Sequence, residues 1–329
     1  MHARKSLLSL AVLVALSGSA LADSSSVTTS QNGSHNVLNV DQGGATGSSI
    51  NISQMGNNNT AGTIGTAIKQ TATNSGISIT QLQSGNISAA DQAGNSNNAS
   101  IYQNGLNHKA ETHQAGDHNS ASINQDGNLY GVASISQGLY GGSYNTASIT
   151  QSGNIGGPWG DIGQTGNNNT ASVTQYSNSG GGYAGVYQHG NANNGAIYQQ
   201  GNTNGGATLQ QSGNNNTGGV QQVSVNNSKA KVNQQGDFNN SGLYQSGTNL
   251  QATINQNGYG NYTSGNQSGS YNEETLLQTG NNNIAVVSQT GAGSLLAANT
   301  VGLTQAGSNL TANVSQTGGS GNVATIYQH

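Results

Sequence analysis

The stretch Asn119-Ser-Ala-Ser-Ile-Asn-Gln-Asp-Gly-Asn-Leu129 determines how this chain folds. Its first seven residues read as a strand, in which side chains at alternate positions share one face. The four residues from Asp126 to Leu129 supply a turn, with Gly127 where a positive φ angle costs least. The inward face of the strand holds Asn119, Ala121, Ile123 and Gln125. One unit of about eleven residues is therefore a strand of seven followed by a turn of four.

The same register returns along most of the chain, with a glutamine about every eleven residues from Gln31 to Gln328. A short fixed period indicates units that cannot bury an apolar face alone and must stack on their neighbours. We therefore predict an all-β protein, a β-solenoid in which two units form one strand–turn–strand coil. Further copies of the inward set are Asn97/Ala99/Ile101/Gln103, Asn145/Ala147/Ile149/Gln151, Asn169/Ala171/Val173/Gln175, Asn283/Ala285/Val287/Gln289 and Asn322/Ala324/Ile326/Gln328.

About 26 phased glutamines predict about 13 coils, stacked at roughly 4.8 Å as two parallel, in-register sheets with amyloid-like cross-β spacing. Amide side chains in register would form ladders, each amide donating to one neighbouring coil and accepting from the other. A ladder of this kind is satisfied everywhere except at its ends. The residues predicted to form the ladders and to support self-assembly are Gln103, Gln114, Gln125, Gln175, Gln289, Gln328, Asn97, Asn119, Asn169, Asn283 and Asn322.

Charge is scarce, and its placement supports this register. Only 5% of the 329 residues are charged and 31% are hydrophobic, which excludes a conventional core of large side chains. Because an inward charge would be costly in a narrow core, we expect strand charges to face outward. Only Glu274 falls on inward parity, where we expect a local register shift or a weakened coil. The charges on outward parity are Lys69, Lys109, Lys229, Lys231, Asp41, Asp91, Glu111 and Glu273.

Three interruptions of the repeat predict loops. The intervals Gln54–Gln70 and Gln289–Gln305 are five residues too long, and Gln137–Gln164 contains the pair Pro158-Trp159. A solenoid tolerates insertions in its turns better than in its strands. We expect Pro158 and Trp159 to lie in a lateral loop that covers a coil edge.

The amino terminus is typical of an exported protein. Residues 1–22 carry Arg4 and Lys5, then an apolar run, then Ala20-Leu21-Ala22, which together predict a cleaved secretory signal. Residues 23–30 form a short segment and residues 31–329 the predicted solenoid domain. Removal of the signal leaves four lysines against ten acidic residues, so no basic patch for nucleic acid and no membrane insertion are expected.

Candidate sites for chemistry are few. His108, His113 and His118 are evenly spaced, but parity places them inward, outward and in a turn, so we expect no metal site. No cysteine is present, and the scattered acids argue against a β-helix lyase or hydrolase, which needs clustered catalytic groups. We predict no enzyme activity and no cofactor. An ice-binding solenoid stays an alternative, although it requires outward Thr-x-Thr ladders and Thr71-Ala-Thr73 is nearly alone.

The repeat resembles the curlin repeat of bacterial curli subunits. The resemblance rests on the sequence pattern Gln-x-Gly-x-x-Asn-x-Ala-x-x-x-Gln, which is intact at 92–103, 114–125, 164–175 and 278–289. The resemblance implies export through a dedicated outer-membrane curli pore and assembly outside the cell into amyloid fibres, or fimbriae, of the biofilm matrix. It also implies a role in cell adhesion, and as partners the chain itself, other curlin subunits, and the secretion pore with its accessory factors.

The resemblance leaves the role within the fibre open. Alanine four positions before glutamine, as at Ala99 and Ala121, is closer to the pattern of the minor, nucleating subunit. Serine six positions before glutamine, typical of the major subunit, occurs at Ser48, Ser75 and Ser228. We therefore expect a fibre-forming structural subunit, with a nucleator of another subunit's fibres as the alternative.

Overall fold

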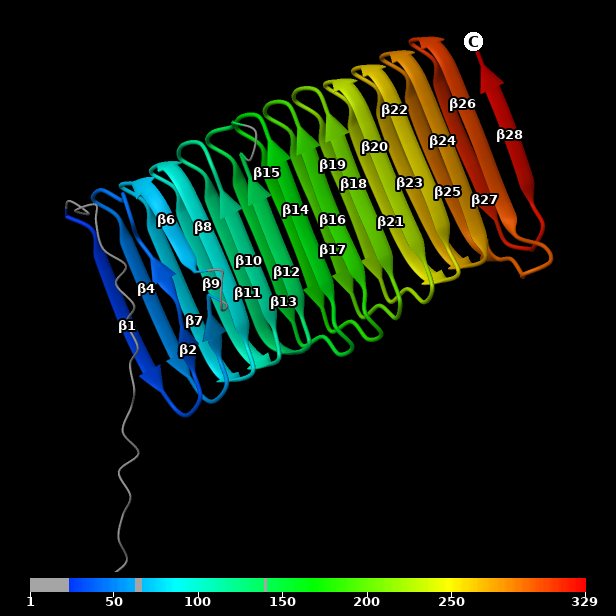
Figure 1. The fold of residues 1–329 in the computed structure, drawn as a ribbon. Coiled ribbons are helices and arrows are strands. Elements are labelled where there is room, and N and C mark those ends of the chain that lie inside the picture. Colours follow the sequence, from blue (N-terminus) through cyan, green and yellow to red (C-terminus); the bar gives the residue numbers. More distant parts are fainter. Residues whose placement is uncertain (1–23, 63–66, 139–140) are drawn as a thin grey trace, which may run out of the picture.

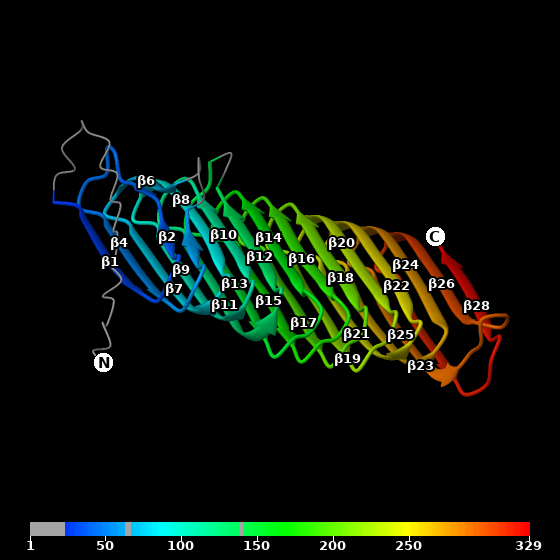
Figure 2. The same ribbon diagram turned by 60° about the horizontal axis from the view of Figure 1, so that its bottom comes forward.

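The computed structural model describes residues 24–62, 67–138 and 141–329. The predicted secretory signal lies outside these residues. Within them the chain forms only strands, which stack as an elongated β-solenoid with β1 and β28 at opposite ends (Figures 1 and 2). The predicted all-β solenoid is confirmed.

Two parallel sheets form the walls of the solenoid, and the chain alternates between them. Sheet A contains β1 (Ser26–Asn32), β4 (Ser49–Met55), β7 (Gly76–Ser84), β9 (Asn98–Leu106), β11 (Ser120–Leu129), β13 (Thr146–Ser152), β15 (Thr170–Tyr176), β17 (Asn194–Gln200), β19 (Thr217–Val223), β21 (Asn240–Thr248), β23 (Tyr262–Ser270), β25 (Ile284–Ala292) and β27 (Thr311–Thr317).

Sheet B contains β2 (Val37–Leu38), β3 (Val40–Asp41), β5 (Thr60–Ala61), β6 (Ile68–Thr73), β8 (Ile87–Asn95), β10 (Lys109–Gln114), β12 (Val132–Gln137), β14 (Trp159–Thr165), β16 (Tyr183–His189), β18 (Gly206–Ser212), β20 (Lys229–Asp237), β22 (Gln251–Tyr259), β24 (Asn272–Asn281), β26 (Asn299–Ser308) and β28 (Val323–Gln328).

One coil consists of a sheet A strand and the sheet B segment that follows it, so the 13 strands of sheet A correspond to 13 coils, as predicted. Equivalent residues of successive coils pair with each other. Ile123 pairs with Ile101 on one side and Ile149 on the other. This register follows from the sequence, because a slip by one residue would turn every apolar side chain of a strand outward.

The core is the space between the two sheets, and it is filled by the alanines and the branched aliphatic side chains of the inward faces. Ala121 and Ile123 are buried, whereas Ser120, Ser122 and Asn124 between them are not. The charges expected on outward parity are likewise not buried. The predicted facing of the strands is therefore confirmed.

Stacked glycines fix the shape of the turns. Gly213 and Gly258 have φ angles of +116° and +130°, in the region that favours glycine. A Cβ atom on Gly213 would lie 2.1 Å from the carbonyl oxygen of Gly236 in the next coil, and one on Gly258 would lie 2.0 Å from that of Gly280. Glycine follows the glutamine by two residues because the backbones of successive turns leave no room for a side chain.

The three interruptions differ in structure. Between Gln54 and Gln70 the sheet B strand is split into β5 and β6, and between Gln289 and Gln305 the extra residues form a loop at 293–298. At the third interruption we expected both Pro158 and Trp159 to lie in a lateral loop, and this expectation is wrong for Trp159. Pro158 lies in a turn, but Trp159 is the first residue of β14 and pairs in register with Val132 and Tyr183.

Candidate functional site: amide ladders and open coil ends

The glutamine side chains form one continuous ladder in each sheet. In sheet A the Nε2 atom of Gln103 donates to Oε1 of Gln125 at 3.0 Å, and Gln175 donates to Gln199 at 2.9 Å. The sheet A ladder runs without a break from Gln31 to Gln316. The sheet B ladder runs in the same way from Gln42 through Gln114 to Gln328.

In the ladder amides after Gln31, the second N–H ties the two sheets together. Gln103 donates to the carbonyl oxygen of Ile87 at 3.1 Å, and Gln114 donates to that of Asn98 at 3.0 Å. Both acceptors are at the start of the strand that faces the glutamine across the core. Each buried amide therefore keeps both N–H groups paired, which avoids the cost of about 1–3 kcal/mol for an unsatisfied buried polar group.

Both ladders have a direction. At every step the glutamine of the earlier coil donates and that of the later coil accepts. At the carboxyl-terminal end, Gln316 and Gln328 each use one N–H on a backbone carbonyl, of Thr300 and Thr311. Their other N–H has no partner among the described residues, and at the opposite end the same holds for the Oε1 atoms of Gln31 and Gln42. One end thus presents donors and the other presents acceptors.

The asparagines form a second ladder at the turns. The Oδ1 atom of Asn97 accepts the backbone N–H of Asn119 at 2.8 Å, and Asn283 accepts that of Leu310 at 3.0 Å. Their Nδ2 atoms donate to carbonyls of turn glycines, as Asn169 does to Gly190 at 2.8 Å. In the last coil Asn322 donates its backbone N–H to Oδ1 of Asn299, and its own Oδ1 has no partner in the described chain.

Serine can replace asparagine in this ladder. Ser75 donates its backbone N–H to Oγ of Ser48 at 3.1 Å, and Asn97 donates to Oγ of Ser75 at 3.0 Å. The Oγ atom of Ser228 accepts from Leu250 in the same way. Serine and asparagine thus act as equivalent acceptors in the slot six residues before glutamine, and the ladder stops where that slot holds a residue without an acceptor, such as Leu250.

His108 occupies an asparagine slot and is fully buried, as its parity predicts. Neither ring nitrogen has a hydrogen-bond partner in the described chain. The ring extends beneath the next coil, where Gly131 has no side chain: a Cβ there would lie 3.1 Å from Nδ1. Burial lowers the pKa of His108 from 6.5 to about 4, so its ring is neutral at physiological pH.

Glu274 faces the core in regular register, so the expected register shift is wrong, and a weakened coil stays a prediction. It pairs with Ala252 and Val301, and its two carboxyl oxygens have no hydrogen-bond partner in the described chain. The facing strand carries Gly265 where other coils have a branched aliphatic residue, and a Cβ on Gly265 would lie 2.5 Å from Oε1 of Glu274. The long side chain fills the space that glycine leaves, and burial raises its pKa to about 8.

The two terminal coils are incompletely covered. Ala324 and Ile326 of β28 pack against the core but are only partly buried, and Val323 and Tyr327 are exposed. At the other end β1 pairs with β4 along one edge only within the described chain. Each end therefore presents unpaired backbone groups and apolar side chains, which are the features that recruit another strand.

The remaining histidines lie apart from His108. His113 is on the outer face of β10, and His118 lies in a turn, stacked on Tyr144 with ring centroids 4.6 Å apart. Among the described residues no group of three or more His, Cys, Asp or Glu side chains could hold a metal ion. The same part of the chain contains no helix long and apolar enough to cross a membrane.

One segment of the chain matches a known family. Residues 94–127 match the model of the curlin associated repeat, a segment that covers β9, β10 and part of β11 with their turns. No curated protein matches the chain. The resemblance to the curlin repeat family is therefore confirmed, by a match over residues 94–127 whose register the structure continues through the coils on either side.

Proposed function

We propose that this chain is a structural subunit of extracellular, curli-type amyloid fibres, and that it assembles by adding the first coil of one subunit to the last coil of another. The direction of the glutamine ladders is the observation that supports this proposal. Free Nε2 donors of Gln316 and Gln328 at one end match free Oε1 acceptors of Gln31 and Gln42 at the other. Joining unlike ends completes both ladders, whereas joining like ends places two donors or two acceptors together.

Such a contact joins two different surfaces of the subunit and does not close on itself, so it generates a filament rather than a closed oligomer. Both sheets would continue across the junction in the parallel register that they have within the subunit. The partly buried Ala324 and Ile326 would then be covered by the inward side chains of the next subunit's first coil. A junction would resemble an internal step between coils.

The setting of this function follows from the repeat family. As a curlin-repeat protein the chain would be secreted, pass the outer membrane through the curli pore, and contribute to adhesion and the biofilm matrix. Its partners would be further copies of itself, other curlin subunits, and the pore with its accessory factors. It would act as structural material and not as an enzyme, and it would bind neither nucleic acid nor a cofactor.

Polymerisation of the chain without residues 1–22 tests the proposal. We expect a disordered monomer that assembles after a lag, with the lag abolished by preformed seeds, and fibres that diffract at the cross-β spacings of about 4.8 Å and about 10 Å. A product that stays monomeric and soluble at micromolar concentration would overturn the proposal. Cross-seeding with a purified major curlin, in both directions, distinguishes a subunit from a nucleator: a nucleator accelerates the other protein far more than itself.

A further inference from the structure

The two broad faces of the solenoid differ in charge. On each strand three outward positions precede the ladder glutamine. Across all strands of sheet A, which lie wholly within the described residues, none of these positions holds Asp, Glu, Lys, Arg or His. On sheet B the corresponding positions carry Asp41, Lys69, Asp91, Lys109, Glu111, His113, Asp161, Lys229, Lys231 and Glu273.

From β1 to β15 the outer face of sheet A holds short side chains at every position but Tyr102, and beyond β15 the tyrosines Tyr198, Tyr244 and Tyr262 project from it. Its middle row, three positions before each glutamine, contains serine in five consecutive coils. None of these five hydroxyl groups makes a hydrogen bond to another part of the described chain. On sheet B, Trp159 packs edge-on against Tyr183, and Tyr187 donates to Asp161 at 2.6 Å. The five serines are Ser78, Ser100, Ser122, Ser148 and Ser172.

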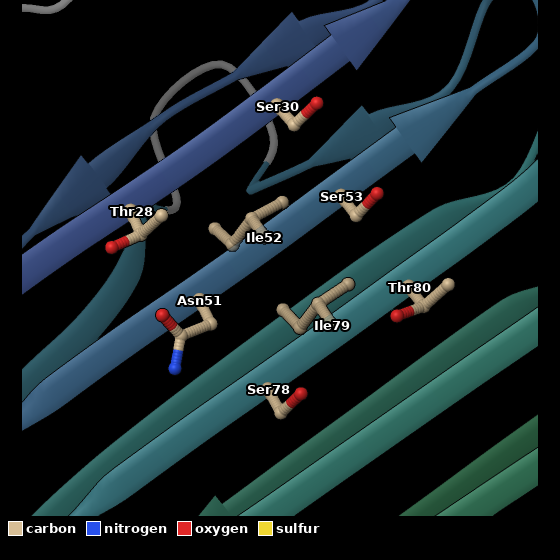
Figure 3. Close-up of a pocket in the computed structure, with 8 residues that line it drawn as sticks. All are labelled: Thr28, Ser30, Asn51, Ile52, Ser53, Ser78, Ile79 and Thr80. Atoms are coloured by element: carbon tan, nitrogen blue, oxygen red, sulfur yellow. The ribbon is translucent and has the colours of Figure 1, made fainter.

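At its amino-terminal end this face has a furrow between two of its rows. Figure 3 shows it across β1, β4 and β7, where a depression of about 180 Å³ lies between two lines of small polar side chains. Ile52 and Ile79 belong to the strands beneath the furrow, with their side chains buried in the core. A furrow flanked by short side chains is the shape that a row of side chains from a second, flat sheet can enter, as in the dry interfaces between paired sheets of amyloid. One line is Thr28, Asn51 and Ser78, and the other is Ser30, Ser53 and Thr80.

From this face we infer that two filaments pair side by side through sheet A, with a second copy of this chain as the partner. Burying the three outward rows of sheet A against a second copy desolvates no charge, since Asp126 of β11 lies beyond them at the turn, whereas burying sheet B would take lysines and carboxylates out of water. Short side chains also lose little rotamer freedom when they are fixed. With thirteen strands spaced about 4.8 Å apart and seven residues per strand rising about 3.3 Å each, the face of sheet A has an area of about 1,400 Å² per subunit. This area exceeds the roughly 800 Å² that each partner buries in a standard stable interface.

The inference rests on the proposed function, because pairing joins filaments that end-to-end assembly has already formed. The test places two lysines on the face, two coils apart, as Ser122→Lys with Ser172→Lys. The matched control places two lysines on sheet B, as Ser136→Lys with Gln210→Lys. Mass per unit length, measured by dark-field electron microscopy, distinguishes single from paired filaments, and seeded elongation is followed in parallel.

We expect wild-type and sheet B variant fibres to have the mass per length of two filaments. The sheet A variant should have half that mass per length, and its elongation rate should stay within about twofold of wild type.

A second experiment mixes preformed fibres of the sheet A lysine variant with fibres of the double variant Ser122→Asp with Ser172→Asp. Opposite charges should restore pairing, and should do so less at high salt. Single wild-type filaments, or an unchanged mass per length in the sheet A variant, would overturn the inference. A wild type that forms no fibre at all overturns the proposed function, and this inference with it.

Discussion

Glu274 and Gly265 share one space between the two sheets, and neither residue suits its position alone. A carboxyl group without hydrogen bonds is costly in a core, and a glycine in the aliphatic row leaves a void beside Leu243 and Val287. Together they fill the coil, because the Glu274 side chain extends into the space that a side chain at position 265 would occupy. The carboxyl group is neutral in this site, since its pKa is raised to about 8.

The pair predicts strong coupling in a double-mutant cycle. Glu274→Ala alone should leave a cavity, and Gly265→Val alone should collide with the carboxyl group, so both single variants should be less stable than wild type. The double variant restores the usual alanine and valine and should recover most of that loss, with a coupling energy of about 1–3 kcal/mol. Denaturant titration of assembled fibres measures the four stabilities. Additive effects would show that the two side chains do not share the space.

The same pair predicts a pH dependence. The folded carboxyl group has a pKa of about 8 and the unfolded one about 4.5, so the folded state holds a proton that the unfolded state releases. Stability should therefore fall as pH rises from about 4.5 to about 8. Loss of this slope in the double variant, measured by denaturant titration between pH 5 and 8.5, checks the assignment to Glu274.

His108 should have the opposite effect on acid stability. Its folded pKa is about 4 against 6.5 for the free side chain, so the unfolded state binds more protons between these values. Stability should decrease as pH falls from about 6.5 to about 4, by about 3 kcal/mol in full. His108→Asn restores the acceptor of the turn ladder, and we expect it to lessen this loss when fibre dissolution is compared at pH 7 and pH 4.5. An equal loss in both proteins would assign the acid sensitivity elsewhere.

At the scale of the strand, alternation of side chains decides what each position tolerates. Ile123 is buried between Ile101 and Ile149, whereas Ser122, one residue earlier, is exposed. Lysine at position 123 would place an unpaired ammonium group in a core about 10 Å wide, at a cost of several kcal/mol in every subunit. Lysine at position 122 would remain in water.

We therefore expect Ile123→Lys to block or severely delay fibre formation and Ser122→Lys to leave the rate of elongation nearly unchanged. Seeded growth, followed by light scattering or a fluorescent amyloid dye, compares the two variants directly. Equal behaviour, or the reverse order, would mean that the strand faces the other way.

The strands and their register could be predicted from the sequence because alternation and the glutamine spacing both report on the same local geometry. The direction of the ladders could not, since either end of a glutamine amide can face the next coil. Nor could the partner of Glu274 be found, because Gly265 faces it only after the chain has closed a coil. Trp159 was placed in a loop because its glycine and proline neighbours indicate a turn, yet the turn ends one residue before it.

For the whole molecule, the proposed assembly places subunit addition at the two ends. Gln328 and Asn322 belong to the last coil and keep hydrogen-bonding groups that have no partner among the described residues, whereas Gln175 and Asn169 are satisfied on both sides by neighbouring coils. In the proposed assembly the growing interface would depend on the terminal pair, and the mid-chain pair would affect only internal stability.

We expect Gln328→Ala with Asn322→Ala to slow elongation more than Gln175→Ala with Asn169→Ala. Elongation from sheared seeds, at matched seed number and monomer concentration, gives the two rates. Circular dichroism of the fibres verifies that each variant still forms β-structure. If both double variants elongate at the same rate, the terminal coils are not where subunits join.

The loop at 293–298 has a consequence for digestion by proteases. Leu295 and Leu296 are 81% and 97% exposed, at the tip of a short turn between β25 and β26. A protease that cuts between them separates the chain into two pieces, but β26 still pairs with β24, and β27 with β25, on either side of the cut. The nicked subunit stays in place because each strand is held by its neighbours in the stack and not by the loop that connects it. Enzymatic attack at this loop would therefore shorten the polypeptides of a fibre without shortening the fibre.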